Sequence, residues 1–347
     1  MYTPYYTITN KILRQIGIIE ACKEVIDHAP LLPYYEKKFQ DEAIVRTVHY
    51  GTHIEGNGLN LNQAERVLQG QNVIARERDI KEIINYRRVM DYISDIQDKS
   101  KITDDIIKKM HKITVNKILE DDQCGVYRKT QVVIKNSTTG ETSFTPPSAV
   151  SVPFQMKEFI AYINRSNQED IHPVLKSASV HYEFVRIHPF IDGNGRVGRA
   201  LSTLILFHEG YDIRKFFSLE EFFDTDDNRY YQALQSVAKN NGELTFWLEY
   251  FTEGLAIELT KIKERIEGIS VDAKLKEKLG GQPMLLSDRQ LKIIEYIQKT
   301  GYLQNKAFKM LFSMVSEDTV LNELKVLLKA GLIKKQGATK SARYIMS

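Results

Sequence analysis

Apolar residues recur at helical spacing along most of the chain. The stretches with this pattern begin near Ile8, Glu36, Leu61, Ile80 and Thr103. The same spacing returns in residues 174–185 and in residues 197–208, on either side of a segment rich in Gly, Asn and Arg. Asp226 precedes another helical stretch, and residues 244–269 form the last one of this part. The pattern predicts a mainly helical protein.

One short segment changes to the period of β-strands. Residues 132–134 and 142–145 are strand-like, and the polar residues 136–140 lie between them. Pro146-Pro147 ends the second strand. This segment predicts a single β-hairpin attached to the helical fold.

The C-terminal part has its own pattern. Residues 274–282 are rich in Lys and Gly and predict a linker. After it, three helical stretches open at Ser287, Lys306 and Ser316, and residues 332–335 and 343–345 predict a short hairpin. Three helices followed by a hairpin resemble a winged helix. We therefore expect an N-terminal helical region at 1–100, a central domain at 101–270 and a winged-helix-like domain at 283–347.

Composition is that of an ordinary globular chain. Of 347 residues, 42% are hydrophobic and 27% are charged. No apolar run approaches the roughly 20 residues that span a bilayer, so no membrane partner is expected. The start has neither a basic lead nor an apolar stretch, and Cys22 and Cys124 are the two cysteines. These features predict a cytoplasmic location.

Charge is distributed unevenly along the chain. Residues 285–347 contain eleven Lys or Arg and five Asp or Glu, a net charge of +6. The basic excess agrees with DNA contact by the C-terminal domain. Winged helices also serve protein contacts or simply pack, and no residue here is identified as a reader of bases.

Residues 188–199 hold the densest chemistry of the chain. His188 has an ordinary pKa of about 6.5, which suits a general base that takes a proton from an attacking hydroxyl. Pro189 ends the preceding helix, and Gly193-Asn194-Gly195 can turn backbone N–H groups toward one point at the start of the next. Such a point binds an anion.

Phosphate is the anion that the neighbouring residues favour. Arg196 and Arg199 lie three residues apart and so share a helical face beyond the glycine turn. Asp192, directly before the turn, supplies an oxygen ligand for Mg²⁺ bound to phosphates. The bland alternative is a plain connection between helices with two arginines on a solvated face.

The segment resembles the Fic family signature, His-x-Phe-x-(Asp/Glu)-Gly-Asn-Gly-Arg-x-x-Arg, and every specified position matches. The resemblance implies a Fic-type helical bundle that transfers AMP from ATP to a Ser, Thr or Tyr hydroxyl of a protein. It makes His188 the base, Phe190 the anchor of the loop in the core and Asp192 the ligand of Mg²⁺. The implied nucleotide-binding residues are Gly193, Asn194 and Gly195 on the α- and β-phosphates and Arg196 and Arg199 on the β- and γ-phosphates.

A second segment, Ile54-Glu55-Gly56-Asn57, resembles the inhibitory-helix motif of one Fic subclass, (Ser/Thr)-x-x-x-Glu-(Gly/Asn). In that subclass the glutamate pairs with the second arginine of the signature, here Arg199, and blocks the γ-phosphate. The resemblance therefore implies autoinhibition by Glu55. The Ser/Thr position is Gly51 in this chain, and Thr52 follows one place later. The alternative is that Glu55 is an ordinary charged residue near a helix end.

The resemblance also implies partners. The hairpin at 131–146 corresponds to a flap that holds an extended segment of the protein target, and self-modification would make the chain its own target. Tyr231 and, more weakly, Tyr230 correspond to residues that line the nucleoside pocket. DNA for the C-terminal domain and a second copy of the chain in a homodimer complete the expected partners.

Two classes of function follow from these features. The first is a protein adenylyltransferase with ATP as co-substrate and Mg²⁺ as cofactor. The second is a regulator that acts through its winged helix, with the Fic core as a sensor. Within the enzyme class, removal of AMP or transfer of another phosphate-containing group stays open.

Overall fold

The computed structural model describes residues 2–29, 31, 33–96, 101–135, 142–165, 171–268, 287–312, 315–337 and 342–347. Residue contacts divide the chain into two compact units, one of residues 1–28 and 39–264 and the other of residues 29–38 and 265–347. The predicted linker at 274–282 lies outside the described residues.

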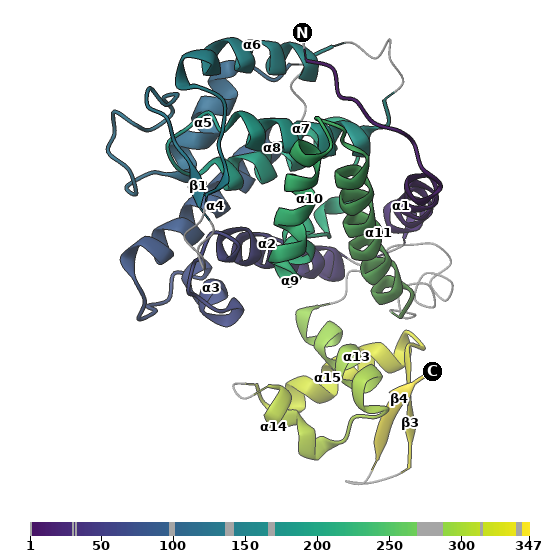
Figure 1. The fold of residues 1–347 in the computed structure, drawn as a ribbon. Coiled ribbons are helices and arrows are strands. Elements are labelled where there is room, and N and C mark those ends of the chain that lie inside the picture. Colours follow the sequence, from purple (N-terminus) through teal and green to yellow (C-terminus); the bar gives the residue numbers. More distant parts are fainter. Residues whose placement is uncertain are drawn as a thin grey trace. The chain divides into compact units, whose positions relative to one another are not determined.

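The first part of the chain is helical, as predicted (Figure 1). Its helices are α1 (Asn10–His28), α2 (Pro33–His53), α3 (Leu61–Leu68), α4 (Glu77–Ile96), α5 (Asp104–Thr114), α6 (Val152–Ile163), α7 (Pro173–Ile187), α8 (Asn194–His208), α9 (Leu219–Thr225), α10 (Asp227–Lys239) and α11 (Thr245–Gly268). Short 3₁₀ turns lie at Ala149–Ser151 and Ile213–Lys215. The cap residues predicted at Thr103 and Asp226 accept hydrogen bonds from Ile106 N and Arg229 N.

Helices α7 and α8 lie in the middle of the larger unit. Their apolar side chains share one buried cluster with residues of α4, α5 and α6. Most of α8 is buried, including two arginines, which is the pattern of a helix inside a core rather than on a surface. The loop between α7 and α8 is therefore held from both sides by packed helices.

The N-terminal segment is fastened to the start of α11. Tyr5 and Glu243 form an isolated β-bridge, and Leu244 N donates to Tyr5 O at 2.8 Å. The Thr9 hydroxyl donates to Glu249 at 2.7 Å. Residues far apart in the chain thus close the larger unit.

The predicted hairpin is present as two short antiparallel strands, β1 (Ile134–Lys135) and β2 (Thr142–Phe144). Ile134 pairs with Phe144 and Lys135 pairs with Thr142. Residues 136–141 lie outside the described part.

The smaller unit contains α13 (Asp288–Thr300), a 3₁₀ turn at Asn305–Ala307, α14 (Phe308–Leu311), α15 (Glu317–Lys329), β3 (Ile333–Gln336) and β4 (Arg343–Met346). Ser287 forms a capping box with Gln290, and Ser316 caps α15, as the sequence predicts. Strands β3 and β4 pair antiparallel from Ile333 with Met346 to Gln336 with Arg343. The winged-helix assignment of these elements stays a prediction.

The sequence predicts a helix at residues 156–163, which is α6, but it gives no prediction for α9. Residues 219–225 form α9, which brings Leu219, Glu220 and Phe223 into the core. Among the helices of the described ranges, none is long and apolar enough to cross a membrane.

Candidate active site

The segment at 188–199 is a loop and the start of a helix, as predicted. Helix α7 ends at Ile187, and His188 caps it with φ 50° and ψ 59°. Gly193, with φ 77°, precedes α8, which begins at Asn194. Two left-handed residues thus bring the backbone from one buried helix into the next.

The middle of this loop is fixed by Phe190. Its ring is fully buried and stacks on the imidazole of His111, with 3.8 Å between the ring centroids. The Asn194 side chain accepts from Phe190 N and donates to Phe190 O, both at 2.9 Å. The amide of Asn194 therefore holds the loop, so this residue can meet a phosphate only through its backbone. This agrees with an anion site built from backbone N–H groups, as predicted for Gly193-Asn194-Gly195, and the phosphate role itself stays a prediction.

His111 supports the same loop, as a structural histidine. Gly125 N donates to its Nδ1 at 2.8 Å, so the proton is assigned to Nε2, which donates to Asp192 O at 3.0 Å. Burial lowers the pKa of His111 to about 4. A neutral ring with both nitrogens bonded fits this position.

His188 is partly buried and has one nitrogen without a bond in the described structure. Its Nδ1 lies 3.3 Å from Val185 O, which can only accept, so Nδ1 carries the proton and Nε2 is left as the acceptor. Burial lowers the pKa of His188, and the charge of Arg128 acts in the same direction. The Val185 carbonyl, Glu55 and Asp192 act in the opposite direction. The net lowering counters the tendency of a helix C-terminus to hold a protonated imidazole.

Arg196 is buried and lies between two carboxylates. Its Nη1 is 3.2 Å from Glu82 on α4, and its Nη2 is 3.4 Å from Asp192. Arg78, on the exposed end of α4, contacts the same two carboxylates at 3.0 and 2.8 Å. Arg196, the first arginine of the signature, is thus held in position by charged side chains and does not project into solvent.

Asp192 fits the role of a Mg²⁺ ligand. Burial would raise the pKa of this carboxyl, but Arg196, the Gly193 N–H and Arg78 together lower it, so the group is ionised. Within the described ranges, no group of three or more His, Cys, Asp and Glu side chains could hold a metal. A metal at Asp192 would then take its other ligands from phosphates and water, as Mg²⁺ commonly does. The Arg78 guanidinium would have to leave Oδ2.

Arg199 is also buried, with its side chain 1% exposed. Its Nη2 donates to Glu55 Oε1 at 2.7 Å and to Gly51 O at 2.7 Å. Burial would lower the pKa of Arg199, but Glu55 and the Tyr230 and Tyr86 hydroxyls raise it well above its ordinary value. The buried state of both arginines excludes the alternative of a connection with a solvated arginine face.

The carboxylate of Glu55 lies directly over Gly195. A Cβ built on Gly195 would be 2.0 Å from Glu55 Oε1 and 3.2 Å from Arg199 Nη1. The space at the start of α8, where an anion meets the helix dipole, is therefore filled by a carboxylate of the same chain.

Gly51 differs from the family motif for a steric reason. A Cβ at this position would be 2.4 Å from Tyr86 Cε1 and 3.2 Å from Glu220 Cγ. Thr52 does not replace the missing side chain, because its hydroxyl donates within α2 to Val48 O and His49 O at 3.0 Å. The Gly51 carbonyl meets Arg199 instead.

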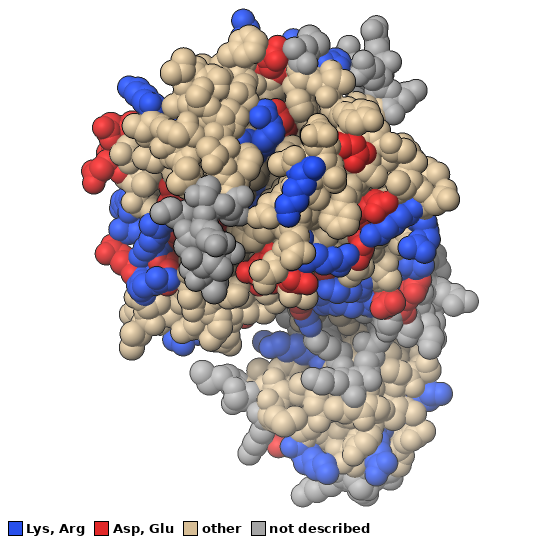
Figure 2. Space-filling view, viewed as in Figure 1, with Lys and Arg blue, Asp and Glu red and all other residues tan. Residues whose placement is uncertain are grey.

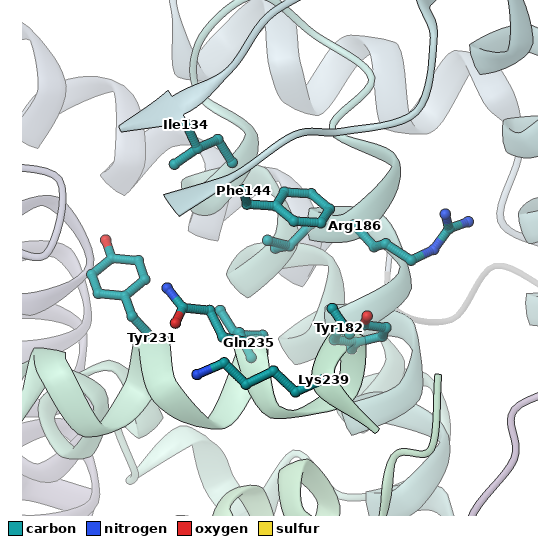
Figure 3. A pocket seen from close by; sticks show the side chains of 10 residues that line it. Ile134, Phe144, Tyr182, Arg186, Tyr231, Gln235 and Lys239 are labelled. Carbon is teal, nitrogen blue, oxygen red and sulfur yellow. The ribbon is translucent and has the colours of Figure 1, made fainter. Parts of the chain in front are cut away.

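An apolar pocket lies between the hairpin and helices α7 and α10. Figure 3 shows Tyr231, Gln235 and Lys239 along α10, facing Ile134 and Phe144 of the two strands. Tyr231 is 38% exposed, whereas Tyr230 is 1% exposed and is not among the lining residues. The Tyr230 hydroxyl instead lies 2.9 Å from Nε2 of His181. Of the two tyrosines expected in a nucleoside pocket, the structure brings only Tyr231 to this one.

Sequence reasoning missed the residues that hold the site from outside the signature. Arg78 and Glu82 on α4, Tyr86 and Glu220 form contacts that no local motif announces. Arg128 also lies outside the signature, between α5 and the hairpin, and its backbone contacts are equally hidden in the sequence. Contacts between residues that are far apart in the chain produce no periodic pattern in a single sequence.

Comparison with known proteins gives consistent results. Residues 101–206 match the model of the Fic/DOC family. The chain is 29% identical over 178 residues to the "Protein adenylyltransferase Fic" of Drosophila grimshawi, covering 50% of this chain and 35% of that protein. It is 28% identical over 209 residues to "Protein adenylyltransferase fic-1" of Caenorhabditis elegans, covering 59% and 39%. The chain thus spans well under half the length of these relatives.

The fold of this chain resembles the folds of solved structures. A Fic family protein from Desulfovibrio desulfuricans G20 superposes with a TM-score of 0.69 and 23% identity, covering 100% of this chain and 98% of that one. Fic-1 of Caenorhabditis elegans superposes with a TM-score of 0.60 and 23% identity, covering 74% and 72%.

Proposed function

Because the chain contains a Fic/DOC family domain at residues 101–206, we propose that it is a protein adenylyltransferase. It moves AMP from ATP to a Ser, Thr or Tyr hydroxyl of a protein, with the chain itself among its targets. The observation that carries the proposal is that His188 Nε2 has no hydrogen-bond partner among the described residues, on the loop that leads into a helix start covered by the Glu55 carboxylate.

The reaction needs a base and an anion site close together. His188 Nε2 takes the proton of the target hydroxyl as its oxygen attacks the α-phosphorus of ATP, and pyrophosphate leaves. The N–H groups of Asn194 and Gly195 face the phosphates at the start of α8, with Gly193 as the turn whose own N–H donates to Asp192, and Arg196 and Arg199 balance the phosphate charge. A general base of this kind contributes about 10²–10⁴-fold to the rate.

Asp192 holds the Mg²⁺ of the nucleotide. When bound, the metal neutralises phosphate charge and orients the phosphate chain. The ionised carboxyl of Asp192 and the exposed position of Arg78 support this assignment, because a side chain that is 56% exposed can leave Oδ2 at low cost.

The pocket between the hairpin and α10 takes the nucleoside. Its walls are mostly apolar, with the Tyr231 ring and the Gln235 amide at α10, which suits a flat base with a polar edge. The buried Tyr230 ring packs beside that of Tyr231, with 5.2 Å between the ring centroids. The hairpin above it presents strand edges to which an extended target segment can add.

Glu55 is the internal brake of the enzyme. Its carboxylate fills the space over Gly195 and engages Arg199, so a γ-phosphate cannot take the same place. Because Arg199 is buried and already paired, it has little freedom to bind the Glu55 carboxylate and a γ-phosphate at the same time. Productive binding of ATP therefore requires Glu55 to move out.

Labelling with two forms of ATP tests the proposal. Glu55→Gly and Glu55→Gln proteins are incubated with ATP carrying the label on the α- or the γ-phosphate, together with a cell lysate. We expect both variants to incorporate the α-label well above wild type, and the γ-label not at all. Glu65→Gln, an exposed carboxylate that is bonded to Gln69, is the matched control and should behave as wild type.

Three outcomes would contradict the proposal. Incorporation of the γ-label would identify phosphate transfer. Loss of label from a pre-labelled target would identify removal of AMP. Equal initial rates for wild type and Glu55→Gly at saturating ATP would remove the brake and leave Glu55 a structural residue.

The smaller unit favours DNA as a second partner. Lys334, Lys335 and Arg343 are exposed on β3 and β4, whereas charges of both signs alternate over the face of the larger unit in Figure 2. Basic side chains on a hairpin suit phosphate contacts. Fluorescence anisotropy with a random duplex should show affinity that falls with salt and weakens in a Lys334→Ala/Lys335→Ala variant. No binding at low salt would exclude this partner.

A further inference from the structure

Arg128 is a buried arginine at the root of the hairpin, 5% exposed. Its guanidinium donates to backbone carbonyls: Nε to His188 O at 2.8 Å, Nη1 to Thr130 O at 3.2 Å and Nη2 to Pro147 O. Nη2 also lies 3.5 Å from Ile187 O. Within the described part of the chain, no carboxylate forms an ion pair with it. Such an arginine acts as a multiple hydrogen-bond donor rather than as half of a salt bridge.

The carbonyls that Arg128 contacts belong to two groups. Thr130 and Pro147 stand directly before and after the hairpin at 131–146. Ile187 and His188 mark the end of α7, and Arg128 N also donates to Pro189 O at 2.9 Å. One residue therefore joins both ends of the hairpin to three consecutive residues at the proposed base.

His188 needs such support because of its backbone. A non-glycine residue in the left-handed region is disfavoured by about 1–2 kcal/mol relative to the right-handed one. If the backbone relaxed, the direction of the imidazole would change with it. The Nε bond to His188 O fixes the peptide plane that follows the ring, and the Nδ1 contact with Val185 O fixes the ring itself.

We propose that Arg128 is a positioning residue that locks the hairpin to the catalytic loop, so that the target segment and the imidazole of His188 keep one geometry. The inference rests on the proposed function, since it assigns the hairpin to the target and His188 to the base. The lock itself is a property of the chain without substrates, and so it can be tested apart from the reaction.

The first test uses hydrogen exchange and needs no turnover. Amide exchange is measured by mass spectrometry for wild type, Arg128→Lys and Arg128→Ala, with Arg87→Ala as the control. Arg87 is an arginine on α4 that pairs only with Asp91 in the described structure. We expect faster exchange in Arg128→Ala both at residues 130–135 and 142–147 and at residues 187–190, with α10 and α11 unchanged. Faster exchange in one group alone would refute the lock.

The second test uses kinetics in the Glu55→Gly background. Arg128→Ala should lower kcat for AMP transfer by about tenfold or more, because displacement of a reacting group by about 1 Å can cost on the order of 10²-fold. KM for ATP should stay within about threefold, since Arg128 does not contact the pocket or the start of α8. Added guanidinium ion, below unfolding concentrations, should restore part of the Arg128→Ala rate and none of the Arg87→Ala rate.

The outcomes separate the inference from the function on which it rests. An unchanged kcat, or a loss confined to KM, would overturn the positioning role. If the Arg128→Ala protein fails to fold, Arg128→Lys keeps the charge but loses the fork of donors, and it should show the same exchange pattern and a smaller fall in kcat. Absence of any AMP transfer by Glu55→Gly would overturn the proposed function, whereas the exchange result would still decide the lock.

Discussion

His188 combines a left-handed backbone with a ring nitrogen, Nε2, that has no partner among the described residues. The left-handed conformation, the Nδ1 contact and the lowered pKa all leave Nε2 ready to accept a proton at neutral pH. A side chain that keeps this backbone but cannot accept the proton isolates the chemical role.

We predict that His188→Asn in the Glu55→Gly background lowers AMP transfer by about 10²-fold or more. Asparagine tolerates the left-handed region, so the loop should keep its shape. ATP affinity, measured by calorimetry, should stay within about threefold of the parent. A variant that still transfers AMP at the parental rate would remove His188 from the role of base.

We predict that Asp192→Ala uncouples ATP binding from Mg²⁺. In the Glu55→Gly parent, ATP affinity should rise on addition of Mg²⁺ and fall on chelation, whereas in Asp192→Ala the two values should coincide. Asp91→Ala, which removes an exposed carboxylate paired with Arg87, is the control. An equal Mg²⁺ effect in Asp192→Ala and the parent would show that the metal is held elsewhere.

At the scale of single residues, the sequence predicted the functional residues of one contiguous loop, 188–199, and few of the residues that hold this loop. The types and spacing of His188, Asp192, Arg196 and Arg199 pointed to an anion site with a base. The burial of both arginines and the carbonyl contacts of Arg128 could not be predicted, because they depend on which helices meet in space. Asn194 shows the same limit, since the bonds of its side chain to the Phe190 backbone depend on the folded loop.

At the scale of elements, the contact between α2 and α4 decides how Glu55 is presented. Gly51 lets the two helices approach so closely that the Tyr86 ring takes the place of a side chain. The Tyr86 hydroxyl then reaches the buried Glu220 at 3.1 Å. The Gly51 carbonyl oxygen accepts a hydrogen bond from Arg199.

We predict that Gly51→Ser, which restores the residue type of the family motif, destabilises this protein. Overpacking of a buried contact typically costs about 1–3 kcal/mol, and here the neighbours are the buried Tyr86 ring and the Cγ of the buried Glu220 side chain. Gly17→Ser in α1 is the matched control, because a Cβ there meets nothing within 4 Å. Urea unfolding should give a lower midpoint for Gly51→Ser alone. Equal midpoints for the two variants would contradict the steric account.

The order of the elements was largely predictable, and the failures have physical reasons. Long amphipathic patterns predicted the helices, and the cap residues Thr103, Ser287 and Ser316 predicted where three of them begin. Helix α9 was missed because seven residues give too little periodicity to recognise, although it delivers Glu220 to the core.

At the scale of the whole molecule, buried neutral histidines link stability to pH. His181 on α7 is enclosed by aromatic side chains and bonded to the Tyr230 hydroxyl. Burial, with a contribution from Arg199, lowers the pKa of His181 to about 3. The unfolded chain has an ordinary histidine pKa of about 6.5 and so binds the proton first as the pH falls.

We predict that the free energy of unfolding falls more steeply with acid in wild type than in His181→Gln. The stabilisation is present above about pH 6.5 and is lost by roughly 1.4 kcal/mol per pH unit as the pH falls toward 3. Urea unfolding at pH 7.5, 6.5 and 5.5 measures both proteins. His111 titrates in the same direction in both, so the difference isolates His181. A difference that is constant over this range would contradict the linkage.

The pairing of Glu55 with Arg199 also has a consequence in time. The two residues are 144 positions apart, and the glutamate comes first in the chain. Synthesis delivers the N-terminal part of a protein before the rest. When the loop at 188–199 leaves the ribosome, the segment that contains Glu55 has already been synthesised. The carboxylate is therefore made before the start of α8 that it covers, and any anion that binds there has to compete with a group of the same chain.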